Sequence, residues 1–135
     1  MPTGFLREPV TRVCGHCGNA FLATKSAEKL CSESCKAQSF NEAAFRSRIW
    51  GKFNLTPEQY EELRIKQGDR CAICRTDDPG QGGPETVRRW CVDHDHTTGK
   101  VRGLLCYNCN KGLGLFQDNW QIILTAAAYV SGSQA

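Results

Sequence analysis

The stretch CVDHDHTTGKVRGLLCYNCN, residues 91–110, decides how this chain folds. Strand-forming residues precede and follow a polar turn over residues 93–100, which predicts two strands, at residues 86–92 and 101–105. The knuckle Cys106-Tyr-Asn-Cys109 then enters a helix through Asn110. Strand, turn, strand and helix are the order of a ββα finger. We therefore predict a small α+β fold in which cysteines fasten the finger at its base.

The cysteines predict two metal sites. Eight of the nine form close pairs, and a C-x2-C step lets one tight turn direct two thiolates at a tetrahedral zinc ion. Helical signals between Cys35 and Cys71 favour sequential over interleaved ligands. A disulfide framework is the alternative, disfavoured by the odd number of cysteines and the lack of a secretory signal. We expect two structural Zn²⁺ ions, and the two ligand sets are Cys14, Cys17, Cys31 and Cys35, and Cys71, Cys74, Cys106 and Cys109. Cys91 is left over. We expect His16 to be a solvent-facing turn residue, and the alternative is that it replaces one cysteine in the first set.

Length and charge fit two small modules. The chain has 135 residues, and its net charge of +3 is unevenly spread. Residues 1–55 hold eight Lys/Arg and four Asp/Glu, whereas residues 56–135 hold nine and ten. A basic half can lie along a polyanion while the other half holds a metal. We expect an N-terminal zinc module with a helix, residues 1–54, and a second domain, residues 55–135.

Targeting signals are missing from the sequence. No apolar stretch reaches the roughly 18 residues of a membrane span, and the first residues do not form a signal peptide. Together with reduced thiols, this leads us to expect a cytoplasmic protein with no membrane partner.

Three helices are expected outside the finger. The first opens at Cys31–Cys35 and stops at Gly51, with Phe40, Ala44 and Phe45 facing inward. The second begins with Thr56 as cap, Pro57 in the first turn and Gln59 closing a capping box. The last covers residues 119–130 and has an apolar stripe that we expect to be buried. That stripe consists of Trp120, Ile123, Leu124 and Ala127.

The finger contains more polar side chains than zinc binding needs. Asp93 and Asn110 offer hard oxygen ligands from opposite walls, a donor set suited to Mg²⁺ or Mn²⁺. His94 would lie beside that ion, where a neutral imidazole can take a proton from water. Because neighbouring side chains of a regular strand point to opposite faces, Asp93 and His94 converge only if the strand ends or twists there. We expect the regular strand to stop at about Val92 or Asp93.

Residues 71–116 resemble the HNH nucleases, most closely the recombination endonuclease VII family of phages. Five motifs carry the resemblance: Leu55-Thr-Pro-Glu-Gln-Tyr60, Cys71-Ala-Ile-Cys74, Val92-Asp-His-Asp-His96, Gly99-Lys-Val-Arg-Gly-Leu-Leu-Cys106 and Cys109-Asn110. The resemblance implies a divalent-metal-dependent DNA endonuclease that leaves 5′-phosphate and 3′-hydroxyl ends. It assigns metal binding to Asp93 and Asn110, the general base to His94, and a second active-site histidine to His96.

The sequence also departs from the family pattern. Cys91 stands where the family's best-known member has a histidine, and Leu113 stands where it has an acid. Only 25 residues follow Asn110, where the phage junction resolvase has a long helical extension used for dimerisation. Junction resolution and obligate dimerisation are therefore not expected to carry over, and the oligomeric state, possibly monomeric, stays open.

DNA would be held through its backbone. Phosphate contacts fix position without choosing sequence. The basic residues that flank the finger are Arg88, Arg89, Lys100, Arg102 and Lys111. The N-terminal module would extend this footprint. A non-catalytic DNA-binding zinc protein is the main alternative, and a protein-interaction module with interleaved zinc ligands is a further one.

Overall fold

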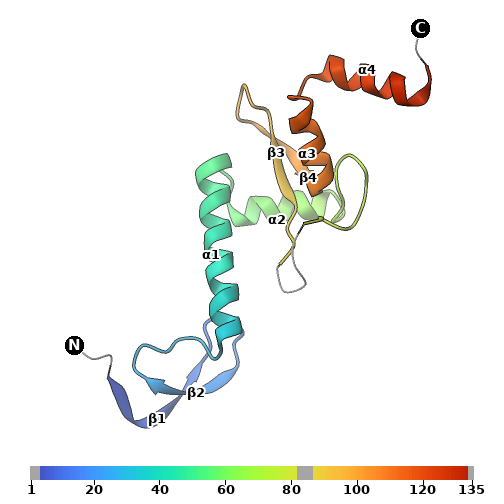
Figure 1. Cartoon of the computed structure of the whole chain (residues 1–135). Helices are drawn as coiled ribbons and strands as arrows, with labels where there is room; N and C mark the ends of the chain where they lie inside the picture. The colour runs from blue at the N-terminus through green and yellow to red at the C-terminus, as the bar shows by residue number, and fades with distance from the viewer. Residues whose placement is uncertain (1–3, 82–86, 134–135) are drawn as a thin grey trace. The chain divides into compact units, whose positions relative to one another are not determined.

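The computed structural model describes residues 4–81 and 87–133 and divides the chain into two compact units, Met1–Trp50 and Gly51–Ala135. The division falls inside helix α1 (Glu33–Phe53), whereas the boundary expected from the sequence is at residues 54/55. Figure 1 shows the order of the elements, each of which carries its label.

The first unit is built on an antiparallel hairpin. Strand β1 (Phe5–Val13) pairs with β2 (Ala20–Lys25), and the register shifts between Phe5 and Val10. Strand β1 contains Pro9 within its length. Pro9 has no N–H to donate to a ladder, and the shift in register lets the strand continue past it.

Helix α1 begins as expected but continues further. The Ser32 hydroxyl accepts a hydrogen bond from the Cys35 N–H at 3.1 Å, so Ser32 caps the first turn. Gly51 does not end the helix, because one glycine lowers helix stability by about 1 kcal/mol relative to alanine without breaking the hydrogen-bond ladder.

The buried side of α1 is narrower than expected. Phe45 and Ile49 are buried one turn apart, whereas Phe40 is 74% exposed and Ala44 is exposed too. Inward-facing positions were predicted at Phe40 and Ala44, and both predictions are wrong. Phe40 and Phe45 are five positions apart, so their side chains point about 140° apart around the helix.

The second unit contains the predicted ββα finger. Strands β3 (Cys91–His94) and β4 (Val101–Leu105) pair antiparallel, and helix α3 (Tyr107–Leu115) contacts β3. Helix α2 (Pro57–Lys66) contacts β4. The β3–β4 hairpin thus contacts α2 through β4 and α3 through β3, and α3 begins directly after β4.

Strand β3 is shorter than predicted at its start. The strand was expected from residue 86, which lies outside the described residues, and residues 87–90 are not in a strand. β4 has only five residues, and its last, Leu105, already pairs with Cys91, so no ladder partner remains for Trp90. The Trp90 carbonyl instead accepts a hydrogen bond from the Tyr60 hydroxyl at 3.2 Å.

The core of the second unit joins α2 to the finger. Its buried apolar side chains come from the loop before α2, from α2 itself and from the hairpin, and they are Leu55, Tyr60, Trp90, Val92, Leu104 and Leu105. The predicted capping box of α2 is present, with Thr56 and Gln59 each accepting from the other's backbone N–H. Burial of this apolar surface is what holds α2 against the strands.

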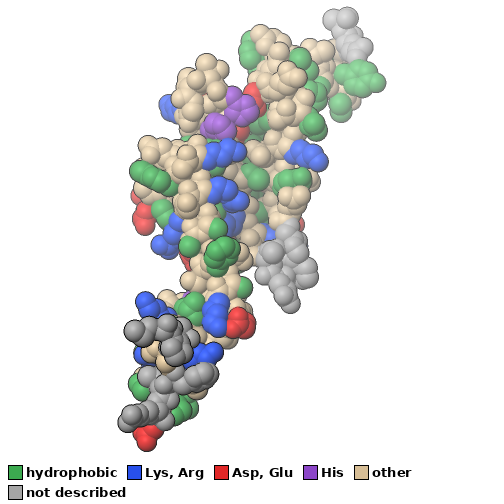
Figure 2. Space-filling model, turned by 60° about the vertical axis from the view of Figure 1, so that its left-hand side comes forward, with side chains coloured by type: hydrophobic (Ala, Val, Ile, Leu, Met, Phe, Trp, Pro, Cys, Tyr) green, Lys and Arg blue, Asp and Glu red, His purple; other side chains and the backbone are tan. Residues whose placement is uncertain are grey.

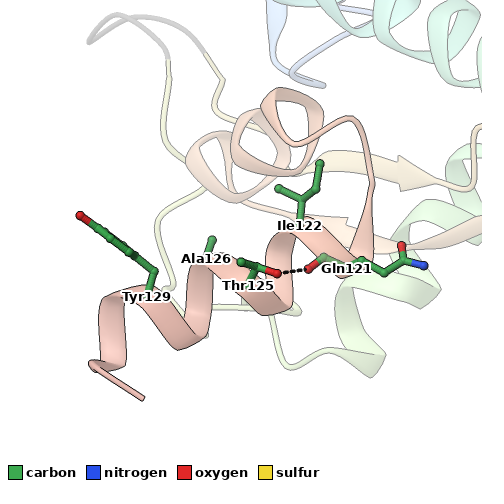
Figure 3. Close-up of a pocket in the computed structure, with 5 residues that line it drawn as sticks. All are labelled: Gln121, Ile122, Thr125, Ala126 and Tyr129. Carbon is green, nitrogen blue, oxygen red and sulfur yellow. Dashed lines mark hydrogen bonds between the residues drawn. The ribbon is translucent and has the colours of Figure 1, made fainter. Parts of the chain in front are cut away.

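Helix α4 (Trp120–Ser131) is exposed along its length. None of its residues is buried, and Trp120 and Leu124 are 63% and 59% exposed, so the predicted buried stripe is wrong. Figure 1 shows α4 projecting beyond α3, where no described strand or helix covers it. A pocket lies along its surface (Figure 3). No helix among the described residues is long and apolar enough to cross a membrane.

Candidate active site

Two clusters of four cysteines form as predicted. Within each cluster the sulfur atoms all lie within 4.8 Å of one another, and the members are Cys14, Cys17, Cys31 and Cys35, and Cys71, Cys74, Cys106 and Cys109. Measured Sγ–Sγ distances of 3.4, 3.5 and 3.7 Å are close to the edge of about 3.8 Å of a tetrahedron with Zn–S bonds of about 2.3 Å. Both clusters can therefore hold zinc. All nine cysteines are free, and Cys91 and His16 lie outside both clusters.

Backbone N–H groups prepare the second cluster for a cation. Burial raises the pKa of Cys71, but hydrogen bonds from the backbone N–H groups of Cys106, Cys74 and Ile73 outweigh it and lower that pKa to about 6. Cys106 is the N-cap of α3, and its sulfur accepts from the Cys109 N–H at 3.4 Å. The thiolate form, which binds metals, is thus favoured at Cys71.

A β-bulge separates the first two predicted active-site residues. Asp93 pairs with Gly103, but His94 pairs with Val101, so Arg102 is an extra residue on β4. Strand β3 runs to His94, and its regular pairing ends at Asp93, as expected. A bulge increases local twist and redirects side chains. The extra residue is on β4, so the bulge lies opposite the step from Asp93 to His94 and breaks the regular pairing of β3 there.

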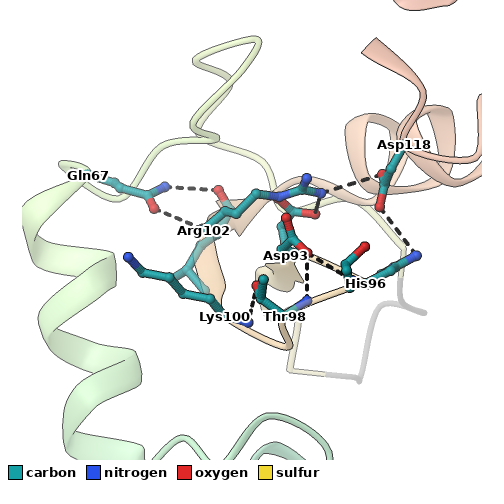
Figure 4. Close-up of polar contacts among 10 residues, drawn as sticks. Gln67, Asp93, His96, Thr98, Lys100, Arg102 and Asp118 are labelled. Atoms are coloured by element: carbon teal, nitrogen blue, oxygen red, sulfur yellow. Dashed lines mark hydrogen bonds and ion pairs between the residues drawn. The ribbon is translucent and has the colours of Figure 1, made fainter.

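The guanidinium of Arg102 donates hydrogen bonds to both carboxylate oxygens of Asp93. Its Nε donates to Asp93 Oδ2 at 2.7 Å, and its Nη2 donates to Oδ1 at 2.9 Å. These hydrogen bonds raise the pKa of Arg102, and the Asp93 side chain is only 13% exposed. Figure 4 shows Arg102 extending from β4 between Asp93 and a second carboxylate, that of Asp118. The Asp93 carboxylate therefore already faces a positive charge.

The two histidines of the motif lie ring against ring. The centroids of His94 and His96 are 4.7 Å apart, and the Phe53 ring meets His94 edge-on at 5.0 Å. His96 is exposed, and its Nδ1 lies 3.3 Å from Asp118 Oδ2. In the space-filling view, purple histidine side chains reach the surface beside acidic ones (Figure 2). Two imidazole rings thus lie together here, one exposed and one half-buried.

Asp95 builds the turn between the strands. Its Oδ1 accepts from the backbone N–H groups of Thr97 and Thr98, both at 2.8 Å, and these bonds lower the pKa of Asp95. Gly99 then takes a φ of +72°, which glycine adopts without steric cost. The second aspartate of Asp-His-Asp-His is therefore a turn residue.

Asn110 lies in the first turn of α3, the helix that contacts β3. Its N–H donates to the Cys106 carbonyl at 3.0 Å, and its half-buried side chain makes no hydrogen bond to any described residue. Asp93 and Asn110 are thus on contacting elements, and no hydrogen bond joins them. One carboxylate and one amide oxygen, with water completing the shell, fit the donors that Mg²⁺ accepts. Within residues 4–81 and 87–133, the two cysteine clusters are the only close groups of three or more His, Cys, Asp or Glu ligands.

The five predicted DNA-contacting residues differ in their surroundings. Arg88 pairs with Asp78 at 3.2 Å, and Arg102 is held by Asp93. Lys100 and Lys111 are exposed, whereas Arg89 is half-buried. Of the five, Lys100 and Lys111 are exposed and form no ion pair with a described residue.

Asp118 was missed by sequence reasoning as a member of this site. The cap of α4 is Asn119, because its Oδ1 accepts from the N–H groups of Gln121 and Ile122. The Asp118 carboxylate instead contacts Arg102 and His96. No local motif marks it, because the contact depends on how the turn after α3 folds back to the hairpin.

Residues 46–132 match the family model described as recombination endonuclease VII, which is more than half of the chain. The chain belongs to the recombination endonuclease VII family. The match includes α2, the finger and the second cysteine cluster, and it leaves out the first cluster. The family expected from the sequence is therefore confirmed.

Proteins similar to this member of the endonuclease VII family occur in mycobacteriophages. The Gene 59 protein of Mycobacterium phage D29 is 39% identical over 88 residues, which are 64% of this chain and 50% of that protein. The Gene 59 protein of Mycobacterium phage L5 is 38% identical over the same shares. The chain thus spans about half the length of these curated relatives. Among solved structures, the ββα-Me type II restriction endonuclease Hpy99I has a TM-score of 0.40 at 21% identity, over 92% of this chain and 66% of that one.

Proposed function

We propose that this protein is a divalent-metal-dependent DNA endonuclease of the HNH type. One observation carries the proposal: in a member of the endonuclease VII family, Asp93 and His94 lie on β3 opposite a bulge in β4, and β3 contacts the helix bearing Asn110. The four-cysteine cluster fastens the loop before the hairpin to the start of that helix. A carboxylate, an imidazole and an amide oxygen are thereby carried by one rigid frame.

Each side chain would have a distinct task. Asp93 and Asn110 would hold one Mg²⁺ or Mn²⁺ ion. When bound, this ion would stabilise negative charge on the scissile phosphate and on the leaving oxygen. His94 would accept a proton from water, and the resulting hydroxide oxygen would bond to phosphorus as the bond to the 3′ oxygen breaks. The products would be a 5′-phosphate and a 3′-hydroxyl. His96 would contact the substrate or the leaving group.

The substrate would be bound by its phosphates. Lys100, directly before β4, and Lys111, in α3, are exposed, and Arg88 and Arg89 precede β3. The N-terminal unit would add positive charge along the DNA, since residues 1–55 hold eight Lys/Arg against four Asp/Glu. The phage origin of the relatives supports action in the cytoplasm of an infected bacterium.

A DNA-binding protein without catalysis is the second candidate. The observation that favours it is the Arg102 guanidinium, which occupies both oxygens of Asp93. If that pair never opened, no cation could replace it. Such a protein would bind DNA through the same basic residues and leave the backbone intact.

Cleavage of supercoiled plasmid separates these candidates. The zinc-loaded protein is incubated with plasmid and Mg²⁺ or Mn²⁺, and nicked and linear products are counted. We expect wild-type cleavage and at least about a 100-fold lower rate for His94→Ala, because a general base contributes about 10²- to 10⁴-fold. His16→Ala is the matched control, since this histidine lies outside the family match and its side chain hydrogen-bonds Gln38. Equal cleavage by His94→Ala and wild type would contradict the assignment.

A further inference from the structure

Asp118 is an acid that the proposed reaction does not yet use. It lies between α3 and α4, and its side chain is only 16% exposed. Its Oδ1 is 3.4 Å from Arg102 Nη2, and its Oδ2 is 3.3 Å from His96 Nδ1. Oδ2 is shielded from solvent and has no well-aligned hydrogen bond among the described residues. Because burying a carboxylate oxygen is costly unless it is paired, this geometry points to a partner that the oxygen is placed to hold.

The turn around Asp118 is unusual in a way that directs this carboxylate. Gln117 and Asp118 both have a φ of 54°, a left-handed conformation that residues other than glycine rarely adopt. Backbone hydrogen bonds from Gln117 to Gly114 and from Asp118 to Leu113, both 3.0 Å, hold the turn. Since Asn119 caps α4, the Asp118 side chain is left for the finger. Figure 4 shows it directed toward Arg102 and His96.

Arg102 therefore lies between two carboxylates, and it binds one of them more closely than the other. It makes two short hydrogen bonds to Asp93 and one longer contact to Asp118. A divalent cation on Asp93 would repel the guanidinium, and Asp118 is the acceptor within reach. At the same time, Asp118 contacts Nδ1 of His96, which leaves the Nε2 edge of that ring for a ligand.

We propose that Asp118 is a positioning residue of the nuclease site, resting on the function proposed above. It gives Arg102 a second carboxylate, so that Asp93 can accept the divalent cation, and it orients His96 through Nδ1. Without Asp118, Arg102 has Asp93 as its carboxylate partner, and cation binding is weakened. Without Arg102, Asp93 is free of the guanidinium, and cation binding is strengthened. The two substitutions thus act in opposite directions, which general damage to the fold cannot produce.

The test is Mn²⁺ binding, measured by the paramagnetic resonance of free Mn²⁺ titrated with zinc-loaded protein. We expect Asp118→Ala to weaken Mn²⁺ binding about 10- to 100-fold, the usual effect of losing a residue that orients a metal site. Asp118→Asn keeps the shape but loses the charge, and should weaken binding in the same direction. Arg102→Met should tighten it. Asp77→Ala, which removes an exposed acid elsewhere, is the control for net charge.

Cleavage kinetics complete the test. Asp118→Ala should lower kcat about 10- to 100-fold and leave KM for DNA nearly unchanged, because Asp118 is shielded and contacts catalytic neighbours instead of substrate. Wild-type Mn²⁺ affinity in both Asp118 variants would overturn the inference and leave the nuclease assignment intact. So would weaker Mn²⁺ binding by Arg102→Met. A wild-type protein that neither binds Mn²⁺ nor cuts DNA would instead overturn the proposed function itself. Thermal unfolding and zinc content establish that each variant is folded.

Discussion

At the residue scale, one glutamine joins α2 to the finger. The Gln67 Nε2 donates to the carbonyls of Leu104 and Arg70 at 2.9 and 3.0 Å, and its Oε1 accepts from the Leu104 N–H at 2.8 Å. Gly103 leaves room for it, since a Cβ there would lie 2.9 Å from Oε1. Gln67 therefore satisfies two backbone groups of a strand whose neighbour, β3, carries Asp93 and His94.

Replacing Gln67 should destabilise the second unit. We expect Gln67→Ala to lower the free energy of unfolding by about 1–3 kcal/mol, because the buried N–H of Leu104 loses its partner. Thermal and urea unfolding of the zinc-loaded protein measure this change. Gln121→Ala, on the exposed surface of α4, is the control and should change stability by less than about 0.5 kcal/mol. A loss at Gln67 no larger than the control would contradict the bridging role.

Single residues also mark how far the sequence could lead. Ligand spacing predicted both cysteine clusters, because a C-x2-C turn has few alternatives. The grip of Arg102 on Asp93 and the contacts of Asp118 could not be predicted. The first depends on a bulge that places one extra residue on β4, and the second on two successive left-handed residues. The expected metal-binding and general-base roles of Asp93, His94 and Asn110 stay predictions.

At the element scale, local signals worked where an element's ends are fixed by its own side chains. The capping box at Thr56 and Gln59 begins α2, and Ser32 caps α1. Length and burial were harder, because they depend on partners. Strand β3 is limited by the five residues of β4, and the apolar face of α4 meets no covering element among the described residues.

Two leucines provide a test of this difference in burial. Leu104 in β4 is 1% exposed, whereas Leu124 in α4 is 59% exposed. We expect Leu104→Ala to lower the free energy of unfolding by about 2–5 kcal/mol, since it leaves a cavity. Leu124→Ala should cost less than about 1 kcal/mol, because it removes little buried surface. Equal losses in chemical unfolding would mean that α4 is covered in solution.

At the scale of the whole molecule, two compact units each hold one cysteine cluster. The family match includes the second cluster and excludes the first. The proposed division of labour follows from this: the second unit cuts, and the first, basic unit increases affinity for DNA. The sequence predicted both clusters and the uneven charge, but the role of the N-terminal unit stays a proposal.

Cysteine variants separate the two units. Cys106→Ser should abolish cleavage, because the second cluster fastens the start of α3 to the loop before the hairpin. Cys14→Ser should retain cleavage at saturating protein but bind DNA less tightly. Native mass spectrometry should find two zinc ions in the wild type and in Cys91→Ser, the control outside both clusters, and one in each cluster variant. Complete loss of cleavage in Cys14→Ser would contradict the division of labour.

The central claim is that Asp93 and Asn110 hold one catalytic cation beside His94. A crystal of His94→Ala with duplex DNA and Mn²⁺, measured at the manganese absorption edge, locates the ion directly. We predict one anomalous peak within about 2.2 Å of a carboxylate oxygen of Asp93 and of the amide oxygen of Asn110, with Arg102 turned away from Asp93. A Mn²⁺ ion bound elsewhere, with Arg102 still paired to Asp93, would contradict the account.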